Sequence, residues 1–360
     1  MGASKQKRGR GALSAPADPY QRYHYEDAEL DGVDPEVREE ESDPGTTRIR
    51  VYPKKAVHRV ESPDIGLCYS MNPYQGCEHG CVYCYARNSH PYWGYSAGLD
   101  FEQKVLVKAN LLPLLEKELR DPNWELLPMM LSGNTDCYQP IERQERLTRG
   151  TLELFLRFGQ PVGIVTKNRL ITRDIDLLEE MASKGLVHVN ISLTTLDEDL
   201  RQMLEPRTAA GKLRLKLIRE LTERSIPVRA LIAPVIPSLN GNELPSLVQG
   251  AAEAGARDIS MAMVRLNGQL PAIFEEWLEH HYPERKEKVL HQIADLHGGQ
   301  VNDSRFGKRL KGEGALASSL HSLFQIAVRK HFKEREMPPL NLERFDNGLG
   351  TQLGLFGSSS

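Results

Sequence analysis

The sequence is poor in cysteine, with only five in 360 residues, and it has no second C-x2-C pair. A structural zinc site usually takes four protein ligands from two such pairs. A disulfide framework usually needs an even number of cysteines in a short secreted chain. Neither site explains the cysteines that are present.

Long apolar runs and a strong excess of charge are also missing. No run approaches the roughly 18 apolar residues that a membrane-spanning helix needs, and the N-terminus has no hydrophobic signal core. The formal net charge is −3 and the pI is about 6.4, so the chain lacks the global basic character of many nucleic-acid-binding proteins. We therefore expect a protein without a membrane partner, in which any surface for nucleic acid is local.

Three of the cysteines lie together in a loop rich in Gly and Pro. Cys77, Cys81 and Cys84 have the spacing C-x3-C-x2-C within residues 72–87, and Tyr83 directly precedes the third cysteine. A [4Fe–4S] cluster normally takes four thiolates. Three closely spaced cysteines with no obvious fourth would leave one iron open to another ligand, which is typical of a catalytic cluster. Free cysteines and a reducible cluster predict a cytoplasmic location.

Strand and helix patterns alternate along most of the chain, which predicts crossovers and a parallel sheet. This alternation alone does not distinguish an open sheet from a partial barrel. The expected strands are 47–52, 65–71, 126–132, 162–166, 187–193, 228–233 and 259–264. The expected helices are 109–120, 147–158, 174–183, 213–224, 244–254, 272–281, 285–296 and 316–331.

The two ends of the chain differ from this central region. Residues 1–46, basic and then acidic, predict a disordered arm with no packed structure before about residue 47. Residues 47–265 form the predicted core, in which the first strand is an edge. Residues 266–335 predict a helical C-terminal extension, and residues 336–360 a loose tail. Within the extension, the basic stretch 303–314 predicts a solvated loop or a phosphate contact.

The cysteine loop resembles that of radical S-adenosylmethionine (SAM) enzymes. This resemblance implies an α/β fold, a partial (β/α)6 TIM barrel, with the site at the carboxyl ends of the strands. It also implies that Cys77, Cys81 and Cys84 bind a [4Fe–4S] cluster and that SAM binds its open iron. An external electron donor, similar to flavodoxin or ferredoxin, would reduce the cluster. The resulting cleavage of SAM would give a 5′-deoxyadenosyl radical that abstracts hydrogen from a substrate.

Residues 64–265 are similar to the spore photoproduct lyase-like group of this superfamily. Motifs that match this group in order are Tyr83 and Tyr85 around the third cysteine, Thr166-Lys167, Ile191-Ser192, Glu205-Pro206 with Arg214, and Ala233-Pro234. The likeness implies two sets of site residues. The implied cofactor-binding residues are Ser132, Gly133, Asn134, Thr135, Asp136, Lys167, Ser192, Thr194, Ala233 and Pro234. The implied catalytic residues are Tyr83, Tyr85 and Cys137.

Several of these roles have alternatives. Tyr85 either passes a hydrogen atom or packs on the loop, and Lys167 either meets the SAM carboxylate or faces solvent. Glu205 and Arg207 either form an internal ion pair or bind substrate. His79, between two cluster cysteines, is expected to support the ligands and not to join them.

The sequence differs from this group at the cysteine that donates a hydrogen atom. The donor cysteine of the group aligns with Gly133, and the nearest cysteine is Cys137, which either faces the site or does not. The resemblance implies repair of a pyrimidine lesion in DNA. Radical modification of RNA, a protein or a small molecule is the alternative, and a non-enzymatic iron–sulfur or zinc-binding regulatory module is a more distant one.

Overall fold

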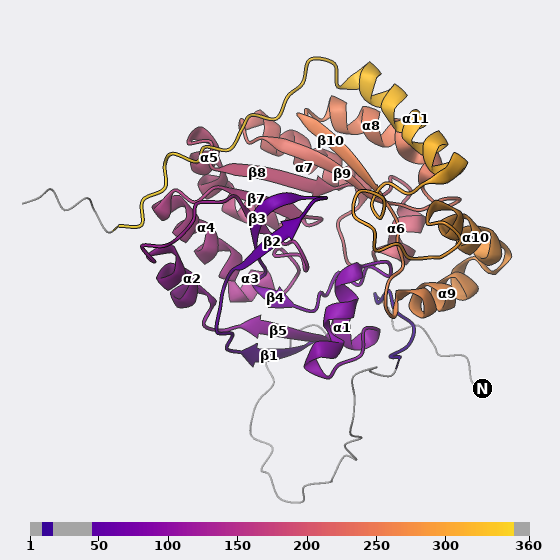
Figure 1. Cartoon of the computed structure of the whole chain (residues 1–360), viewed down its shortest axis with the longest axis horizontal. Helices are drawn as coiled ribbons and strands as arrows, with labels where there is room; N and C mark the ends of the chain where they lie inside the picture. Colours follow the sequence, from indigo (N-terminus) through magenta and orange to yellow (C-terminus); the bar gives the residue numbers. More distant parts are fainter. Residues whose placement is uncertain (1–8, 17–44, 349–360) are drawn as a thin grey trace, which may run out of the picture.

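A curled sheet of seven strands forms the centre of the computed structural model (Figure 1), which describes residues 9–16 and 45–348. The strand order is β10-β9-β8-β7-β6-β3-β2, and every neighbouring pair is parallel except β2 with β3. The strands of this sheet are β2 (His58–Ser62), β3 (Gly66–Met71), β6 (Met129–Leu131), β7 (Val162–Thr166), β8 (Val187–Ser192), β9 (Val228–Val235) and β10 (Asp258–Met263).

The six parallel strands correspond to six of the predicted strands and confirm the predicted α/β partial barrel. The antiparallel edge strand β2 was not predicted. It pairs with β3 through a tight turn, from His58 opposite Ser70 to Ser62 opposite Gly66. β2 therefore covers the outer side of β3, and the two edge strands of this sheet are β2 and β10.

Amphipathic helices cover the sheet and complete the main hydrophobic core. In α4, for example, Leu152 and Phe155 lie one turn apart and are fully buried in this core. Gly159, Gly185 and Gly255 have positive φ angles just after α4, α5 and α8, as expected for helix stops. The helices of the barrel region are α1 (Leu99–Gln103), α2 (Leu111–Leu119), α3 (Glu142–Glu145), α4 (Leu147–Phe158), α5 (Ile175–Ser183), α6 (Glu198–Leu204), α7 (Gly211–Glu223) and α8 (Leu244–Glu253).

A separate sheet of three strands lies beside the barrel. It consists of β1 (Thr47–Val51), β5 (Lys104–Lys108) and β4 (Tyr74–Gln75), in the order β1-β5-β4. The expected strand at 47–52 therefore exists, but it pairs with β5 instead of forming an edge of the main sheet. Short 3-10 helices complete the connections: η1 (Tyr85–Ser89), η2 (Pro91–Trp93), η3 (Arg169–Asp174), η4 (Gly241–Glu243) and η5 (Pro283–Arg285).

Three further helices follow the barrel, as predicted for residues 266–335. They are α9 (Leu270–His281), α10 (Lys286–Leu296) and α11 (Gly314–His331). Trp277 of α9 is fully buried and donates a hydrogen bond from its indole nitrogen to the carbonyl of Met203, at 3.0 Å. Phe274 and Trp277 share a second core with Val82 and Leu204, so α9 packs behind the cysteine loop. Within the described residues, no helix is long and apolar enough to span a membrane.

The segment after α11 is not loose where it is described. Figure 1 shows it, in yellow, running back from α11 along the outside of the molecule to α5. Asn341 donates its backbone N–H to Gly185, and Asp346 donates to Phe158, at 2.8 and 2.9 Å. The expectation of a loose tail is therefore wrong for residues 336–348, while residues 349–360 lie outside the described part.

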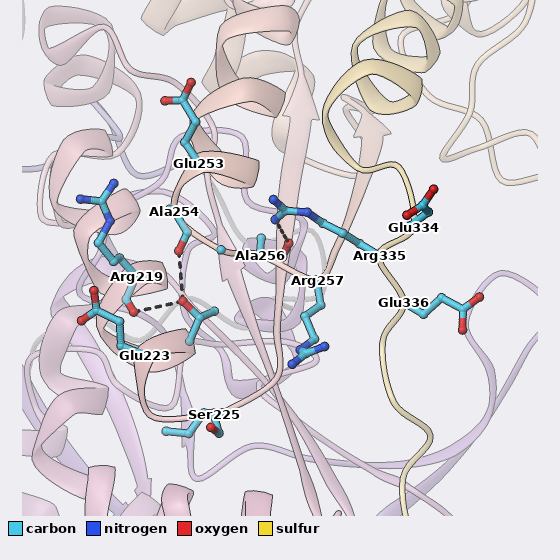
Figure 2. Close-up of a pocket in the computed structure, with 13 residues that line it drawn as sticks. Arg219, Glu223, Ser225, Glu253, Ala254, Ala256, Arg257, Glu334, Arg335 and Glu336 are labelled. Atoms are coloured by element: carbon cyan, nitrogen blue, oxygen red, sulfur yellow. Dashed lines mark hydrogen bonds between the residues drawn. The ribbon is translucent and has the colours of Figure 1, made fainter.

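This returning segment also borders a hollow at the amino ends of β9 and β10 (Figure 2). The hollow measures about 550 Å³ and lies at the opposite end of the strands from the cysteines. Arg335 bridges its rim by donating hydrogen bonds to the carbonyls of Ala252 and Ala256, at 2.9 and 2.8 Å. Thr222 donates to the carbonyl of Ala254. The two hydrogen bonds of Arg335 therefore attach the returning segment to the barrel.

Candidate active site

The carboxyl ends of the parallel strands and the cysteine loop enclose a cavity of about 320 Å³. Polar and charged groups enter it from strand ends, while Met130, Val165, Leu231 and Met263 supply an apolar wall. All the predicted site residues except Thr135, Cys137 and Thr194 line this cavity. Those that line it are Cys77, Cys81, Cys84, Tyr83, Tyr85, Ser132, Gly133, Asn134, Asp136, Lys167, Ser192, Ala233 and Pro234.

The three cysteines of the loop face this one cavity, and none is in a disulfide. Cys77 and Cys81 are buried and Cys84 is partly buried. Burial, ahead of other effects, raises the pKa of all three thiols, so a cationic partner is needed to hold them as thiolates. Three thiols on one cavity fit a [4Fe–4S] cluster with one iron open. Within the described residues, no three His, Cys, Asp or Glu side chains are arranged to hold a single metal ion.

A buried ion pair supports the cysteine loop from behind. Arg87 is fully buried and donates hydrogen bonds to the carbonyls of Gly80 and Cys81, at 3.1 and 2.9 Å. Its guanidinium also lies 2.5 Å from the carboxylate of Glu102, which is likewise fully buried. The positions of two loop carbonyls therefore depend on a charge pair that is shielded from water.

Residues 9–16 pack against this ion pair, and we call them the N-terminal strap. The backbone N–H groups of Gly11 and Ala12 donate to the two carboxylate oxygens of Glu102, at 3.0 and 2.8 Å. Ala12 also belongs to the core that contains Cys81 and Val82. The expectation of no packed structure before residue 47 is therefore wrong for the strap, while residues 1–8 and 17–44 lie outside the described part.

Alanine at Gly11 is expected to displace the strap, because the added Cβ would lie 1.8 Å from the carbonyl oxygen of Gly80. Both hydrogen bonds to the Glu102 carboxylate would then be lost. A hydrogen bond to a charged group stabilises a contact by roughly 1.5–3 kcal/mol. Loss of the two bonds should therefore raise the fraction of molecules in which Cys81 is accessible, and with it the labelling rate, by about tenfold or more. The measurement is the rate at which a thiol reagent labels Cys81 in cluster-free protein.

Gly163→Ala is the matched control for this variant, because the nearest atom to its Cβ would be 3.7 Å away. It should label at the rate of the unaltered protein. Equal rates for Gly11→Ala and Gly163→Ala would show that the strap does not protect the loop.

The second strand motif, residues 132–136, is tied to its neighbours through side chains. Asp136 accepts hydrogen bonds from the Thr166 hydroxyl and the Lys167 backbone N–H, both at 2.8 Å. Nδ1 of His79 lies 3.3 Å from the same carboxylate. Burial opposes the charge, but His79 and the backbone N–H groups of Lys167 and Tyr138 hold the pKa of Asp136 below its ordinary value. Asp136 therefore joins the end of β6 to the end of β7 and to the cysteine loop.

Two other residues of this motif make structural contacts. Thr135 donates from its hydroxyl to the carbonyl of Tyr74, at 2.6 Å, and does not reach the cavity. Asn134 lines the cavity, while its backbone N–H donates to the side-chain oxygen of Asn72, at 2.8 Å. The side-chain nitrogen of Asn134 donates to the Ser89 hydroxyl at 3.3 Å, which leaves the side-chain oxygen of Asn134 as the acceptor of this pair that is available to a ligand.

Glu205 lies at the centre of a buried network beneath the third cysteine. It pairs with Arg214, and both side chains are almost completely buried. Tyr83 donates its hydroxyl to Glu205, and Thr194 donates to it at 2.7 Å. Burial alone would raise the pKa of Glu205, but Arg214, Lys167 and Tyr83 lower it to about 2.

This network corrects three sequence-based expectations. Glu205 does not pair with Arg207, whose guanidinium lies 3.8 Å from Glu78. Glu205 is not a cavity residue either, so binding of substrate is also not its role here. Thr194, expected to bind the cofactor, is fully buried against Glu205 instead. The matched motif included Arg214, nine positions further along in α7, but only the structure identifies it as the ion-pair partner of Glu205.

Lys167 follows β7 and is a cavity cation without a neutralising contact. Among the described residues, its ammonium group makes no hydrogen bond or ion pair. Burial opposes its charge, yet the charges of Glu205 and Cys81 keep the pKa of Lys167 above its ordinary value. A lysine held positive in a partly closed cavity is suited to bind a carboxylate.

The thiol of Cys137 is not positioned for the expected catalytic role. Cys137 is fully buried in the main core and does not line the cavity. Its backbone N–H donates to the Ser132 hydroxyl, and its carbonyl accepts from Thr148. A side chain at Gly133 would be crowded too, because its Cβ would lie 2.8 Å from Oγ of Ser70. Neither position offers a thiol to the cavity.

The two tyrosines beside Cys84 have different surroundings. The hydroxyl of Tyr83 is buried and occupied by Glu205, so this residue packs beneath the loop. Tyr85 is 50% exposed and donates its hydroxyl to the carbonyl of Gly133. Of the two, only Tyr85 therefore has access to both the cavity and solvent.

Sequence reasoning missed one charged cavity residue, Arg265. It lies just after β10, as Lys167 lies just after β7, and it lines the cavity beside Leu310. The rule that site residues follow parallel strands could have identified it. Leu310 could not be found in this way, because it reaches the cavity from the loop between α10 and α11.

Comparisons with known proteins agree with this geometry. A model of the radical SAM superfamily matches residues 71–249. An uncharacterized protein of Mycobacterium tuberculosis is 34% identical over 243 residues, which cover 67% of this chain and 72% of the relative. An uncharacterized protein of Methanocaldococcus jannaschii is 28% identical over 68% of this chain and 88% of the relative.

Solved structures of spore photoproduct lyase have a similar fold. The complex with dinucleoside spore photoproduct is 16% identical, with a TM-score of 0.56, and covers 79% of this chain and 80% of that one. A variant with bound AdoMet and dinucleoside spore photoproduct is 17% identical, with a TM-score of 0.51 and 74% coverage of both chains. At these identities the likeness concerns the fold.

Proposed function

This chain belongs to the radical SAM superfamily, whose cofactors are a [4Fe–4S] cluster and SAM, and on that premise we propose that it acts on a base in nucleic acid. The proposed reaction is of the repair type, on a pyrimidine lesion in DNA. The observation that carries the proposal is the cavity itself, where three cysteine thiols and an unpaired lysine meet beside a half-exposed tyrosine. The similarity of the fold to that of spore photoproduct lyase also supports a reaction on a pyrimidine lesion.

Cys77, Cys81 and Cys84 would hold the cluster, and Lys167 would bind the SAM carboxylate. Ser192 and Asn134 line the same cavity and would offer hydrogen bonds to the rest of SAM. When bound and reduced, the cluster supplies the electron that cleaves SAM to methionine and a 5′-deoxyadenosyl radical. The electron donor proposed for this step is a protein similar to flavodoxin or ferredoxin.

The remaining cavity residues would position these groups and exclude water. Asp136 holds the backbone of Lys167, and the Glu205–Arg214 pair holds Tyr83 beneath the cysteine loop. Met130, Val165 and Leu231 line the cavity with apolar surface, which protects a reactive radical from solvent. Because no thiol is offered at Gly133 or Cys137, hydrogen return to a product radical would come from another group, and Tyr85 is the candidate.

The basic stretch 303–314 does not support nucleic-acid binding, because most of its basic side chains are paired with acidic side chains of this chain. Arg305 pairs with Asp303 and Glu313, and Lys308 pairs with Glu313. Arg309 pairs with Asp64 at the turn between β2 and β3. Most of its positive charge is therefore neutralised within the chain.

The proposal is tested with cluster-loaded, reduced enzyme and SAM. Ultraviolet-irradiated DNA and tRNA are incubated with it in separate reactions, and their nucleosides are analysed by mass spectrometry. We expect a pyrimidine photoproduct in the DNA to decrease and a new nucleoside to appear. A change in tRNA alone would replace DNA repair by RNA modification. If neither changes while 5′-deoxyadenosine is produced, the substrate is not a nucleic acid.

A further inference from the structure

Arg265 is a cavity cation without a described partner. It lies directly after Val264 at the carboxyl end of β10, and it lines the cavity together with Leu310. Among the described residues, its guanidinium makes no hydrogen bond and no ion pair. The nearby Arg309 differs, because it is paired with Asp64. Arg265 therefore presents free donors toward the cavity.

The surroundings of Arg265 favour an added anion. Burial and the neighbouring Arg309 lower its pKa, which means that its charge is incompletely compensated in this structure. Tyr85, Asp64 and Asp303 act in the opposite direction but make no direct contact with it. An anion bound to the guanidinium would restore the compensation, and a planar guanidinium matches a carboxylate or a phosphate through two parallel hydrogen bonds.

SAM does not account for both free cations of the cavity. SAM has one carboxylate and no phosphate, and Lys167, which is near Cys81 and Glu205, is the cation expected to bind that carboxylate. Arg265 follows a different strand and is influenced by Tyr85 and Arg309 instead. Arg265 is therefore free to bind a second anion, and a substrate with a phosphate or a carboxylate would supply one.

We propose that Arg265 is a specificity residue that binds a phosphodiester of the nucleic-acid substrate, next to the base that reacts. This inference rests on the proposed function, and it names Arg265 as the residue that binds the backbone of the nucleic-acid strand. Two exposed aromatic side chains favour the binding of a nucleic-acid strand near Arg265. Tyr85 is 50% exposed, and Phe306, in the same loop as Leu310, is 55% exposed, with the Arg309 guanidinium over one face of its ring, 4.4 Å from the ring centroid. Exposed aromatic side chains beside a cation are typical of proteins that stack unpaired bases and bind the backbone between them.

The test compares a charged and a neutral linkage. Cluster-loaded enzyme with SAM, but without reductant, is bound to a fluorescent single-stranded oligonucleotide and titrated with one of two competing thymidine dinucleotides. One has a phosphodiester and the other a neutral methylphosphonate. For the unaltered enzyme, the phosphodiester should compete better by roughly tenfold or more, as expected for a hydrogen-bonded ion pair. In Arg265→Gln this preference should disappear.

Arg305→Gln is the matched control, because Arg305 is already paired with Asp303 and Glu313. It should keep the preference for the phosphodiester. Inorganic phosphate and a ribodinucleotide serve as further competitors, and phosphate competing as well as either dinucleotide would assign the site to a free anion. The iron content after reconstitution and the midpoint of urea unfolding should be the same in both variants as in the unaltered enzyme, which shows that they are folded and carry the cluster.

The outcomes separate this inference from the proposed function. If the oligonucleotide binds and Arg265→Gln keeps the preference, the role of Arg265 is overturned and the nucleic-acid substrate stands. If the unaltered enzyme cleaves SAM but binds no oligonucleotide, both the nucleic-acid substrate and the phosphodiester site are wrong.

Discussion

Replacing Cys77, Cys81 and Cys84 together by alanine is expected to abolish both iron binding and the cleavage of SAM. The three thiols line one cavity, and the fourth ligand of the cluster is not a cysteine of this site. Without them, no electron reaches SAM, so production of 5′-deoxyadenosine should fall to the level of dithionite without enzyme. Iron and sulfide content after anaerobic reconstitution and 5′-deoxyadenosine by chromatography are the measurements.

Cys68→Ala and Cys137→Ala are the controls, because both thiols are buried outside the cavity. Cys68→Ala should retain iron and activity. Cys137→Ala should also retain SAM cleavage, with at most the moderate loss of stability that a smaller core side chain causes. Loss of iron from either control, or SAM cleavage by the triple variant, would contradict the assignment of the cluster ligands.

Replacing Arg214 by methionine is expected to destabilise the fold by about 3–5 kcal/mol, the usual cost of removing one partner of a buried ion pair. Arg214 is 1% exposed and its partner Glu205 is 0% exposed, so water cannot solvate the carboxylate that remains. Arg214 also donates to the carbonyl of Ser192, at 3.0 Å. The measurement is the free energy of unfolding in urea for cluster-free protein.

The matched control is Arg229→Met, which removes one partner of an exposed pair with Asp258. Here the side chains are 38% and 39% exposed, and the expected change is about 0–1 kcal/mol. The double variant Glu205→Met, Arg214→Met should be less destabilised than Arg214→Met, because it leaves no unpaired buried charge. Equal losses for Arg214→Met and Arg229→Met would show that the buried pair does not stabilise this region.

Much of the fold follows from local patterns. The six parallel strands and the helices that alternate with them were predicted within a few residues of their observed positions, and α4 was predicted with its observed bounds. Apolar spacing and glycine stops act within one element, so the sequence alone carries that information. The three cysteines also lie within eight consecutive residues, 77–84, which is why their spacing alone could predict a cluster site.

The predicted strand ends explain most of the remaining site. Because parallel strands end at one edge of a sheet, residues that directly follow them converge without any further information. Gly133, Lys167 and Pro234, which the family resemblance also indicated, fall just past the predicted strand ends and line the cavity. Arg265 obeys the same rule after β10 and was overlooked.

Other features depend on contacts between distant parts of the chain, which no local pattern encodes. Only the tertiary structure shows that Gly11 packs against Gly80 and that Glu205 pairs with Arg214 instead of Arg207. The tertiary structure is also needed to see that Cys137 lies in the core and that Arg265 has no counter-charge among the described residues. The physical reason is burial, since the removal of water decides which charges must pair and which side chains face the cavity. The sequence by itself thus predicted the three-cysteine loop and the barrel, whereas tertiary packing decided how this loop is supported and which cavity cation has no counter-charge.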